Sequence, residues 1–162
     1  MRFRSLVSAA ALLWTTSIPQ AIGTGQAVTD PSALPEGDGR ELLFRTCAEC
    51  HGVESVTAER RTRAEWQGVV DDMAGRGAQA SDDDVKTLVA YLSINVGRVN
   101  VNRASEEDLK AVVGVSADEA AAIVAHRTKE GSFKTLDDLK RVPGVDGRKL
   151  DERKGRIVFA GQ

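Results

Sequence analysis

A 30-residue repeat in the C-terminal part of the chain constrains the fold more than any other feature. The pattern Asp-Leu-Lys-x-Val-x-Gly-Val occupies residues 108–115 and returns at residues 138–145. A hydroxyl residue, Ser105 or Thr135, stands three positions before the aspartate of each copy, where a helix N-cap would stand. Each copy therefore predicts a helix, a tight glycine turn and a second helix. Two copies predict a compact helical bundle of about sixty residues.

The balance of charge changes sign near Gly97, which predicts two modules joined there. Residues 28–97 contain seven Lys or Arg against thirteen Asp or Glu, whereas residues 98–162 contain thirteen against eleven. The net charges are therefore −6 and +2. The full length of 162 residues is enough for two small domains but not for a large α/β enzyme. The predicted boundaries are 1–27 for an export segment, 28–37 for a linker, 38–97 for the first domain and 98–160 for the second.

The N-terminal segment has the features of a secretory signal. Arg2 and Arg4 precede an apolar run at residues 6–14, and small and turn-forming residues follow. Nine residues rise only about 14 Å as a helix, roughly half of a bilayer core, so this run does not predict a membrane span. Cleavage after Ala21 or Ala27 would leave a periplasmic protein without a membrane span. The alternative is an amphipathic anchor that is retained.

Three segments of the first module show helical periodicity. Residues 41–50 carry apolar side chains at helical spacing, and residues 64–73 place Trp66, Val69, Val70 and Met73 on one face. Residues 81–96 open with Ser81 and an aspartate three positions later, which is a capping-box arrangement. No segment alternates with period two, so we predict an all-α protein.

The sharpest chemical signal is the sequence Cys47-Ala48-Glu49-Cys50-His51. Two thiols at this spacing reach both vinyl groups of a porphyrin, and the adjacent imidazole reaches the iron. A C-x-x-C pair also fits a thioredoxin-like redox pair or half of a zinc site. No strand pattern precedes Cys47, and His126 is the only other histidine in the chain. With the export segment, the motif favours one covalently attached haem c.

His51 would then be the proximal iron ligand, and the second axial ligand has several candidates. Met73 follows Trp66 on an apolar helical face and precedes a Gly-Arg-Gly run. It would supply a thioether that raises the reduction potential, although a methionine here also fits an ordinary core position. His126, a lysine and an open position are the alternatives. Two axial ligands leave no open coordination position, so we predict an electron carrier rather than an enzyme such as a small peroxidase.

Residues 45–97 resemble the small class I-like c-type cytochromes. They are most similar to the haem domains that accompany periplasmic quinoprotein and molybdenum dehydrogenases. The resemblance is carried by the Cys-x-x-Cys-His motif, Trp66, Met73 and the Tyr91-Leu92 pair. It implies a cytochrome c-like fold in which the first and last helices cross and Trp66 packs on or near the porphyrin. It also implies haem-propionate contacts for a basic run that otherwise reads as a solvated turn: Arg60, Arg61 and Arg63.

The same resemblance implies the electron-transfer partners. The donor would be a quinoprotein or molybdenum dehydrogenase, and the acceptor another cytochrome or a terminal oxidase. The acidic first module suggests a partner with a basic docking face.

Residues 99–159 resemble the tandem helix-hairpin-helix domain of competence-type DNA-uptake receptors. The resemblance is carried by VNVNRASEEDLKAVVGV at residues 99–115 and by GSFKTLDDLKRVPGV at residues 131–145. In that family a Gly-hydrophobic-Gly hairpin opens the second helix, and its N–H groups bind a phosphate. The possible phosphate contacts in this chain are Gly114, Gly144, Arg148, Lys149 and Arg153.

This chain departs from that pattern, because Ser116 and Asp146 replace the second glycine of the two hairpins. A carboxylate at position 146 would occupy the place of a phosphate, and a domain charge of +2 is low for a nucleic-acid binder. Residues 140–156 nevertheless hold seven basic residues against three acidic ones. We interpret the module as one for docking, packing or dimerisation, with His126 on a helix surface. The alternative is an exported DNA-binding protein with a haem appendage.

Overall fold

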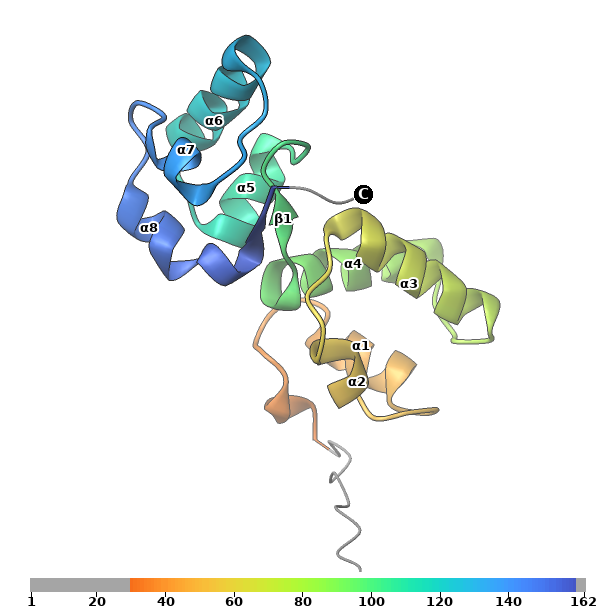
Figure 1. The fold of residues 1–162 in the computed structure, drawn as a ribbon. Helices are drawn as coiled ribbons and strands as arrows, with labels where there is room; N and C mark the ends of the chain where they lie inside the picture. The colour runs from red at the N-terminus through yellow and green to blue at the C-terminus, as the bar shows by residue number, and fades with distance from the viewer. Residues whose placement is uncertain (1–29, 160–162) are drawn as a thin grey trace, which may run out of the picture.

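The computed structural model describes residues 30–159, which fold into two groups of helices with β1 between them (Figure 1). The predicted export segment lies outside the described residues. The elements in chain order are η1 (Pro31–Ala33), α1 (Arg40–Cys47), α2 (Glu54–Thr57), α3 (Arg63–Gly75), α4 (Asp82–Val96), β1 (Val99–Asn100), α5 (Glu106–Val113), α6 (Ala117–Glu130), α7 (Leu136–Lys140), α8 (Gly147–Glu152), η2 (Lys154–Arg156) and β2 (Ile157–Val158). None of the helices within residues 30–159 is long and apolar enough to cross a membrane. The expectation of a mainly helical protein is confirmed, although the two short strands were not expected.

The first group of helices is formed by α1 to α4. Capping boxes begin both long helices of this group. Ser81 and Asp84 cap α4 as the sequence predicts, and Thr62 and Glu65 cap α3, which begins one residue before the predicted helix at residues 64–73. In each box the hydroxyl accepts a hydrogen bond from a backbone N–H of the first turn, and the carboxylate accepts one from the N–H of the N-cap residue. Both bonds satisfy backbone donors that a helix start leaves unpaired. The largest fully buried side chains of this group are Leu43, Val53, Trp66, Leu88 and Leu92.

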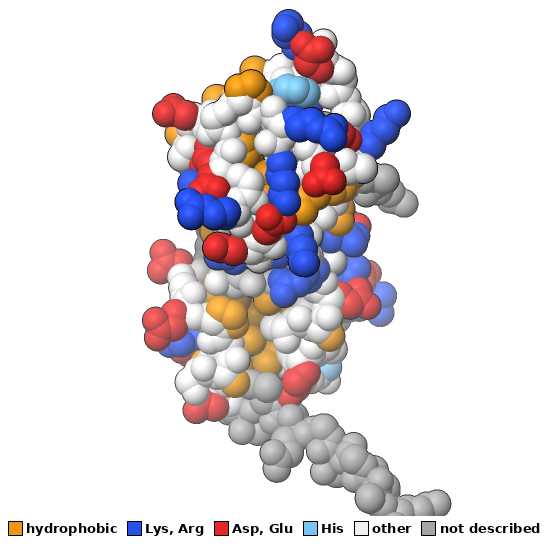
Figure 2. All heavy atoms as spheres, turned by 60° about the vertical axis from the view of Figure 1, so that its left-hand side comes forward, with side chains coloured by type: hydrophobic (Ala, Val, Ile, Leu, Met, Phe, Trp, Pro, Cys, Tyr) orange, Lys and Arg blue, Asp and Glu red, His pale blue; other side chains and the backbone are white. Residues whose placement is uncertain are grey.

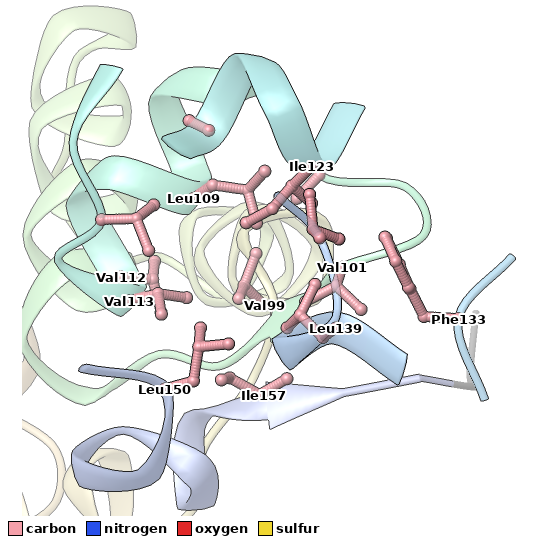
Figure 3. Close-up of a cluster of buried hydrophobic side chains, with 14 residues drawn as sticks. Val99, Val101, Leu109, Val112, Val113, Ile123, Phe133, Leu139, Leu150 and Ile157 are labelled. Atoms are coloured by element: carbon pink, nitrogen blue, oxygen red, sulfur yellow. The ribbon is translucent and has the colours of Figure 1, made fainter. Parts of the chain in front are cut away.

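The second group of helices contains the two repeats, α5–α6 and α7–α8. The turns after α5 and α7 use Gly114 and Gly144, whose φ angles of 80° and 85° lie in the left-handed region that glycine adopts without strain. Figure 3 shows the apolar side chains of both repeats gathered in one cluster. Its fully buried members include Val101, Leu109, Ile123, Leu139 and Leu150. The observed helix–glycine turn–helix repeat agrees with the sequence prediction.

A two-stranded parallel pairing joins the beginning and the end of the second group. Val99 of β1 is paired with Ile157 of β2, and Asn100 with Val158. The Asn102 side chain extends this junction, because its amide donates to the carbonyl of Phe133 and its oxygen accepts the N–H of the same residue. Two residues per strand are too few to show an alternating pattern in the sequence.

Polar contacts also connect the two groups of helices. The buried guanidinium of Arg156 donates to the carbonyl oxygens of Gly97 at 2.8 Å and Ile94 at 2.5 Å, at the C-terminal end of α4. Arg63 Nε, at the start of α3, lies 2.6 Å from Asp108 Oδ1 on α5. These two contacts connect the second group of helices to the C-terminal end of α4 and to the start of α3.

Candidate functional site

A pocket lies among α1, α3, α4 and the segment that follows the Cys-x-x-Cys-His sequence. The space it encloses, including its open mouth, is about 750 Å³. Most of its lining is apolar. The sequence-predicted residues Cys47, His51, Trp66 and Met73 all contribute to it, and Cys50 is exposed next to His51. The apolar side chains around them include Leu43, Val56, Val69, Val70, Leu88 and Leu92.

Both cysteines are free thiols, Cys47 at the end of α1 and Cys50 in the turn that follows it. The helix ends at Cys47, and Ala48 is its C-cap. Burial raises the pKa of the Cys47 thiol. A redox-active C-x-x-C pair needs a depressed thiol pKa, so the environment of Cys47 does not favour the thioredoxin-like interpretation.

The contacts of His51 define which of its ring nitrogens is left for a metal. Nδ1 lies 3.2 Å from the carbonyl oxygen of Gly52 and 3.2 Å from the Ser55 hydroxyl. That hydroxyl donates to the same Gly52 carbonyl at 2.8 Å. Because a carbonyl can only accept, this arrangement assigns the proton to Nδ1 and leaves the lone pair on Nε2. Metal-ligating histidines commonly have their second nitrogen fixed in this way.

Two buried polar groups beside the pocket have no partner in the described part of the chain. They are Trp66 Nε1 and Thr46 Oγ1, both on residues that line the pocket. A buried donor without a partner costs about 1–3 kcal/mol. The Arg61 guanidinium also lines the pocket and lies 5.7 Å from the centre of the Trp66 ring. Of the basic run considered for contacts with an acidic group, Arg61 is thus the member that lines this pocket.

The basic run at the start of α3 is divided between different neighbours. Of its three arginines, Arg61 lines the pocket, whereas Arg63 pairs with Asp108 and Arg60 is exposed.

His126 lies in the second group of helices, half-buried on α6, with its ring stacked on that of Phe133 at a distance of 5.1 Å between ring centres. The structure therefore places Met73, and not His126, at the pocket.

The hairpins of the second group meet at Glu119, for which the sequence pattern predicts no contact. Its buried carboxylate accepts hydrogen bonds from Lys149 Nζ at 2.8 Å, from the Ser116 N–H at 2.6 Å and from the Asp146 N–H at 2.8 Å. The Lys149 contact, followed by the two backbone donors, lowers the pKa of Glu119 to about 2. One internal carboxylate thus contacts an N–H group of both hairpins.

Two of the five sequence-predicted phosphate contacts are paired within the domain. Lys149 binds Glu119, and Arg148 Nε lies 3.5 Å from the Asp146 carboxylate, which also caps α8. Arg153 is exposed, and Gly114 and Gly144 form the hairpin turns. The arrangement leaves fewer donors for a phosphate than the hairpin sequence pattern suggests.

Comparison with known proteins identifies the second group. Residues 94–158 match the family model of the helix-hairpin-helix motif. The match covers the second group of helices, which is similar to a helix-hairpin-helix domain, and it does not reach the pocket of the first group.

Individual relatives align over similarly short lengths. ComE operon protein 1 of Bacillus subtilis is 36% identical over 60 residues, covering 37% of this chain and 29% of that protein. The human endonuclease/exonuclease/phosphatase family domain-containing protein 1 is 41% identical over 69 residues, covering 43% and 12%. An uncharacterized protein of Haemophilus influenzae is 33% identical over 63 residues, covering 38% and 56%. The chain thus spans less than two thirds of each of these relatives. No solved structure matches.

Proposed function

We propose that the first group of helices binds one covalent haem c and that the protein is an exported electron carrier. The observation that supports this proposal is the position of the Cys-x-x-Cys-His sequence at an apolar pocket that Met73 also lines. Haem c, when bound, supplies a one-electron iron couple.

The residues present fit such a group. Cys47 and Cys50 would form the two thioether bonds, and His51 Nε2 and the Met73 thioether would be the axial ligands. The apolar lining would exclude water from the iron, and the unpaired Trp66 indole and the Arg61 guanidinium would bind an acidic substituent. The unpaired indole N–H beside the pocket is consistent with a partner that the protein chain does not supply.

In this proposal the protein carries electrons in the periplasm. The donor is a dehydrogenase of the quinoprotein or molybdenum type, and the acceptor is another cytochrome or a terminal oxidase. The helix-hairpin-helix domain serves as a docking module.

The test is expression in a host with intact c-type cytochrome maturation. We expect a coloured protein, heavier than its peptide by one haem, with a low-spin spectrum and a sulfur-to-iron charge-transfer band. Met73→Leu keeps the apolar volume, so it should keep the attached haem but lose that band. Cys47→Ala with Cys50→Ala should abolish attachment. A colourless wild-type preparation with the mass of the bare peptide would refute the proposal, and a five-coordinate high-spin spectrum would indicate peroxidase-like chemistry instead.

The second candidate function is binding of duplex DNA by the helix-hairpin-helix domain. The comparisons support this alternative more directly than they support electron transfer, because the family match and the relatives concern that motif. The internal contacts of Glu119 argue against a phosphate at both hairpins.

A gel shift with a 20-base-pair duplex (length chosen as about two helical turns) at moderate salt separates the two candidates. Micromolar binding that is lost in Lys149→Glu with Arg153→Glu, and kept in Lys129→Glu with Lys134→Glu, would favour the DNA-binding function. Absence of binding in the wild type would reject it.

A further inference from the structure

A second pocket lies at the seam between the two groups of helices. We call it the seam pocket; its volume is about 610 Å³, including its mouth. Thr62 and Arg63 line it from the start of α3, Arg98 and Asn100 from the linker and β1, and Arg103 and Asp108 from the second group. It therefore exists only when the two groups are assembled.

The seam pocket has an excess of positive charge. Three guanidinium groups line it, against the one carboxylate of Asp108. Arg63 is paired with Asp108, and Arg98 is paired with Glu65 at 2.8 Å. Arg103 is exposed and forms no ion pair with any residue in the range 30–159. The Nε–H of Arg98 is buried and lacks a hydrogen-bond partner among the same residues. The exposed Arg103 guanidinium thus remains for an external anion.

The charge of the seam is opposite to that of the far end of the first group. Figure 2 shows Lys and Arg side chains across the middle of the molecule, with some Asp and Glu side chains among them. The first turn of α4 carries three aspartates, Asp82 to Asp84. Since α4 has 15 residues, this turn lies about 22 Å from the end of the helix at the seam. Such a charge separation orients an approaching charged partner.

The seam pocket directly adjoins the pocket proposed for haem. Arg61 lines the first pocket, and the next two residues, Thr62 and Arg63, line the seam pocket. The Arg98 N–H donates to the Arg61 carbonyl at 2.8 Å, so backbone contacts connect the two sites. A protein docked at the seam would sit beside the cofactor.

We propose that the seam pocket is the docking site for a carboxylate-rich surface of a redox partner protein, with Arg103 as its exposed anchor. This inference rests on the proposed electron-carrier function. An acidic protein surface fits better than nucleic acid for two reasons. Arg103 is the one guanidinium lining the seam pocket without an ion pair among residues 30–159, and a single anchor suits a few carboxylates better than a run of phosphates. The hairpin N–H groups of Ser116 and Asp146, which could otherwise bind a phosphate, are engaged by Glu119.

The test measures the binding of two probes by fluorescence anisotropy at low and high salt. One is a fluorescein-labelled 20-residue polyglutamate, about the number of residues on one side of an interface, and the other is a labelled 20-base-pair duplex of about two helical turns. The full-length mature protein is compared with Arg103→Glu and with Lys129→Glu, an equal charge change at an exposed site on α6. We expect Arg103→Glu to weaken polyglutamate binding by about 10-fold and Lys129→Glu by less than about 2-fold, with the difference fading at high salt.

Two results would overturn the inference. One is equal polyglutamate binding by the two variants, and the other is tighter binding of the duplex that also depends on Arg103. The haem content of the same samples is read from their absorption spectrum. Absence of haem refutes the proposed function whatever the binding data, whereas equal binding by the two variants refutes the docking site in a haem-loaded protein.

Discussion

Glu119 shows how much a single residue can determine in the helix-hairpin-helix domain. Its carboxylate is buried and accepts a side-chain N–H and two backbone N–H groups. Its partners Asp146 and Lys149 lie 27 and 30 positions away. The sequence predicts both hairpins, but it does not predict this contact, because the contact depends on how the two repeats pack. The chemistry of the first pocket, in contrast, can be predicted from the sequence, because it depends on the identity and spacing of the residues from Cys47 to His51.

The depressed pKa of Glu119 predicts a pH-dependent stability. Its folded value of about 2 lies below the usual value of about 4.3. The ionised form therefore stabilises the fold above about pH 4.3, and this contribution, roughly 2–3 kcal/mol, is lost as the pH falls toward 2. Glu119→Gln should lower the free energy of unfolding at pH 7 by about 1.5–3 kcal/mol and flatten its decline in acid. Urea unfolding at pH 7 and pH 3 measures both effects.

Glu130→Gln, an exposed change at the end of the same helix, is the control and should alter stability by less than about 0.5 kcal/mol. If Glu119→Gln has the same acid sensitivity as the wild type, the Glu119 contacts do not stabilise the domain.

Trp66 predicts a fluorescence signature of the cofactor pocket. In a mature chain cleaved after Ala21 or Ala27, Trp66 is the only tryptophan. Its ring is buried against the pocket, so a bound haem would accept its excitation energy. The folded, haem-loaded protein should be nearly non-fluorescent, and guanidinium unfolding should restore the emission. Bright emission from a folded, coloured preparation would contradict the placement of haem beside Trp66.

At the scale of secondary-structure elements, the sequence predicts helices better than it predicts their junctions. Ser81 and Asp84 mark the start of α4 because a capping box is local. The parallel pairing of β1 with β2 joins segments nearly sixty residues apart and leaves no such local pattern. Gly97, which the charge pattern marks as a boundary, lies where α4 ends and β1 is about to begin.

The packing around Gly97 predicts that this position does not tolerate a larger residue. A Cβ atom there would lie 2.2 Å from the Ser93 carbonyl oxygen. Gly97→Ala should therefore force the end of α4 to shift, at a cost of about 1–3 kcal/mol. The control is Gly68→Ala in α3, where a Cβ meets no atom within 4 Å. That change should stabilise the protein by about 0.4–1 kcal/mol, because alanine is the better helix former. Thermal unfolding followed by circular dichroism compares the two variants, and equal effects would contradict the crowding at Gly97.

At the scale of the whole molecule, contacts across the seam make the two groups of helices depend on one another. The charge difference between residues 28–97 and 98–162 predicts two modules but not their contacts. Arg156 belongs to a basic run that the sequence reading treated as a source of phosphate contacts. The structure instead buries its guanidinium against the end of α4, because carbonyl groups at a helix C-terminus attract a cation.

Arg156 should therefore be required for cooperative unfolding. Its guanidinium donates to the carbonyls of Gly97, Ser93 and Ile94. Arg156→Met keeps an apolar chain but leaves these carbonyls without their partner, at a cost of about 1–3 kcal/mol. We expect the wild type to unfold in one guanidinium transition and Arg156→Met to show two. In the variant, Trp66 fluorescence should report the first group, and far-ultraviolet circular dichroism should report both.

The control for this prediction is Arg153→Met, which removes an exposed cation from the same basic run. It should leave a single transition within about 0.5 kcal/mol of the wild type. Limited proteolysis gives an independent reading, because cleavage near Arg98 requires the seam to open and should accelerate in Arg156→Met alone. A single, merely shifted transition in Arg156→Met, with unchanged proteolysis, would mean that the remaining contacts, Arg63 with Asp108 and Arg98 with the Arg61 carbonyl, suffice to hold the two groups together.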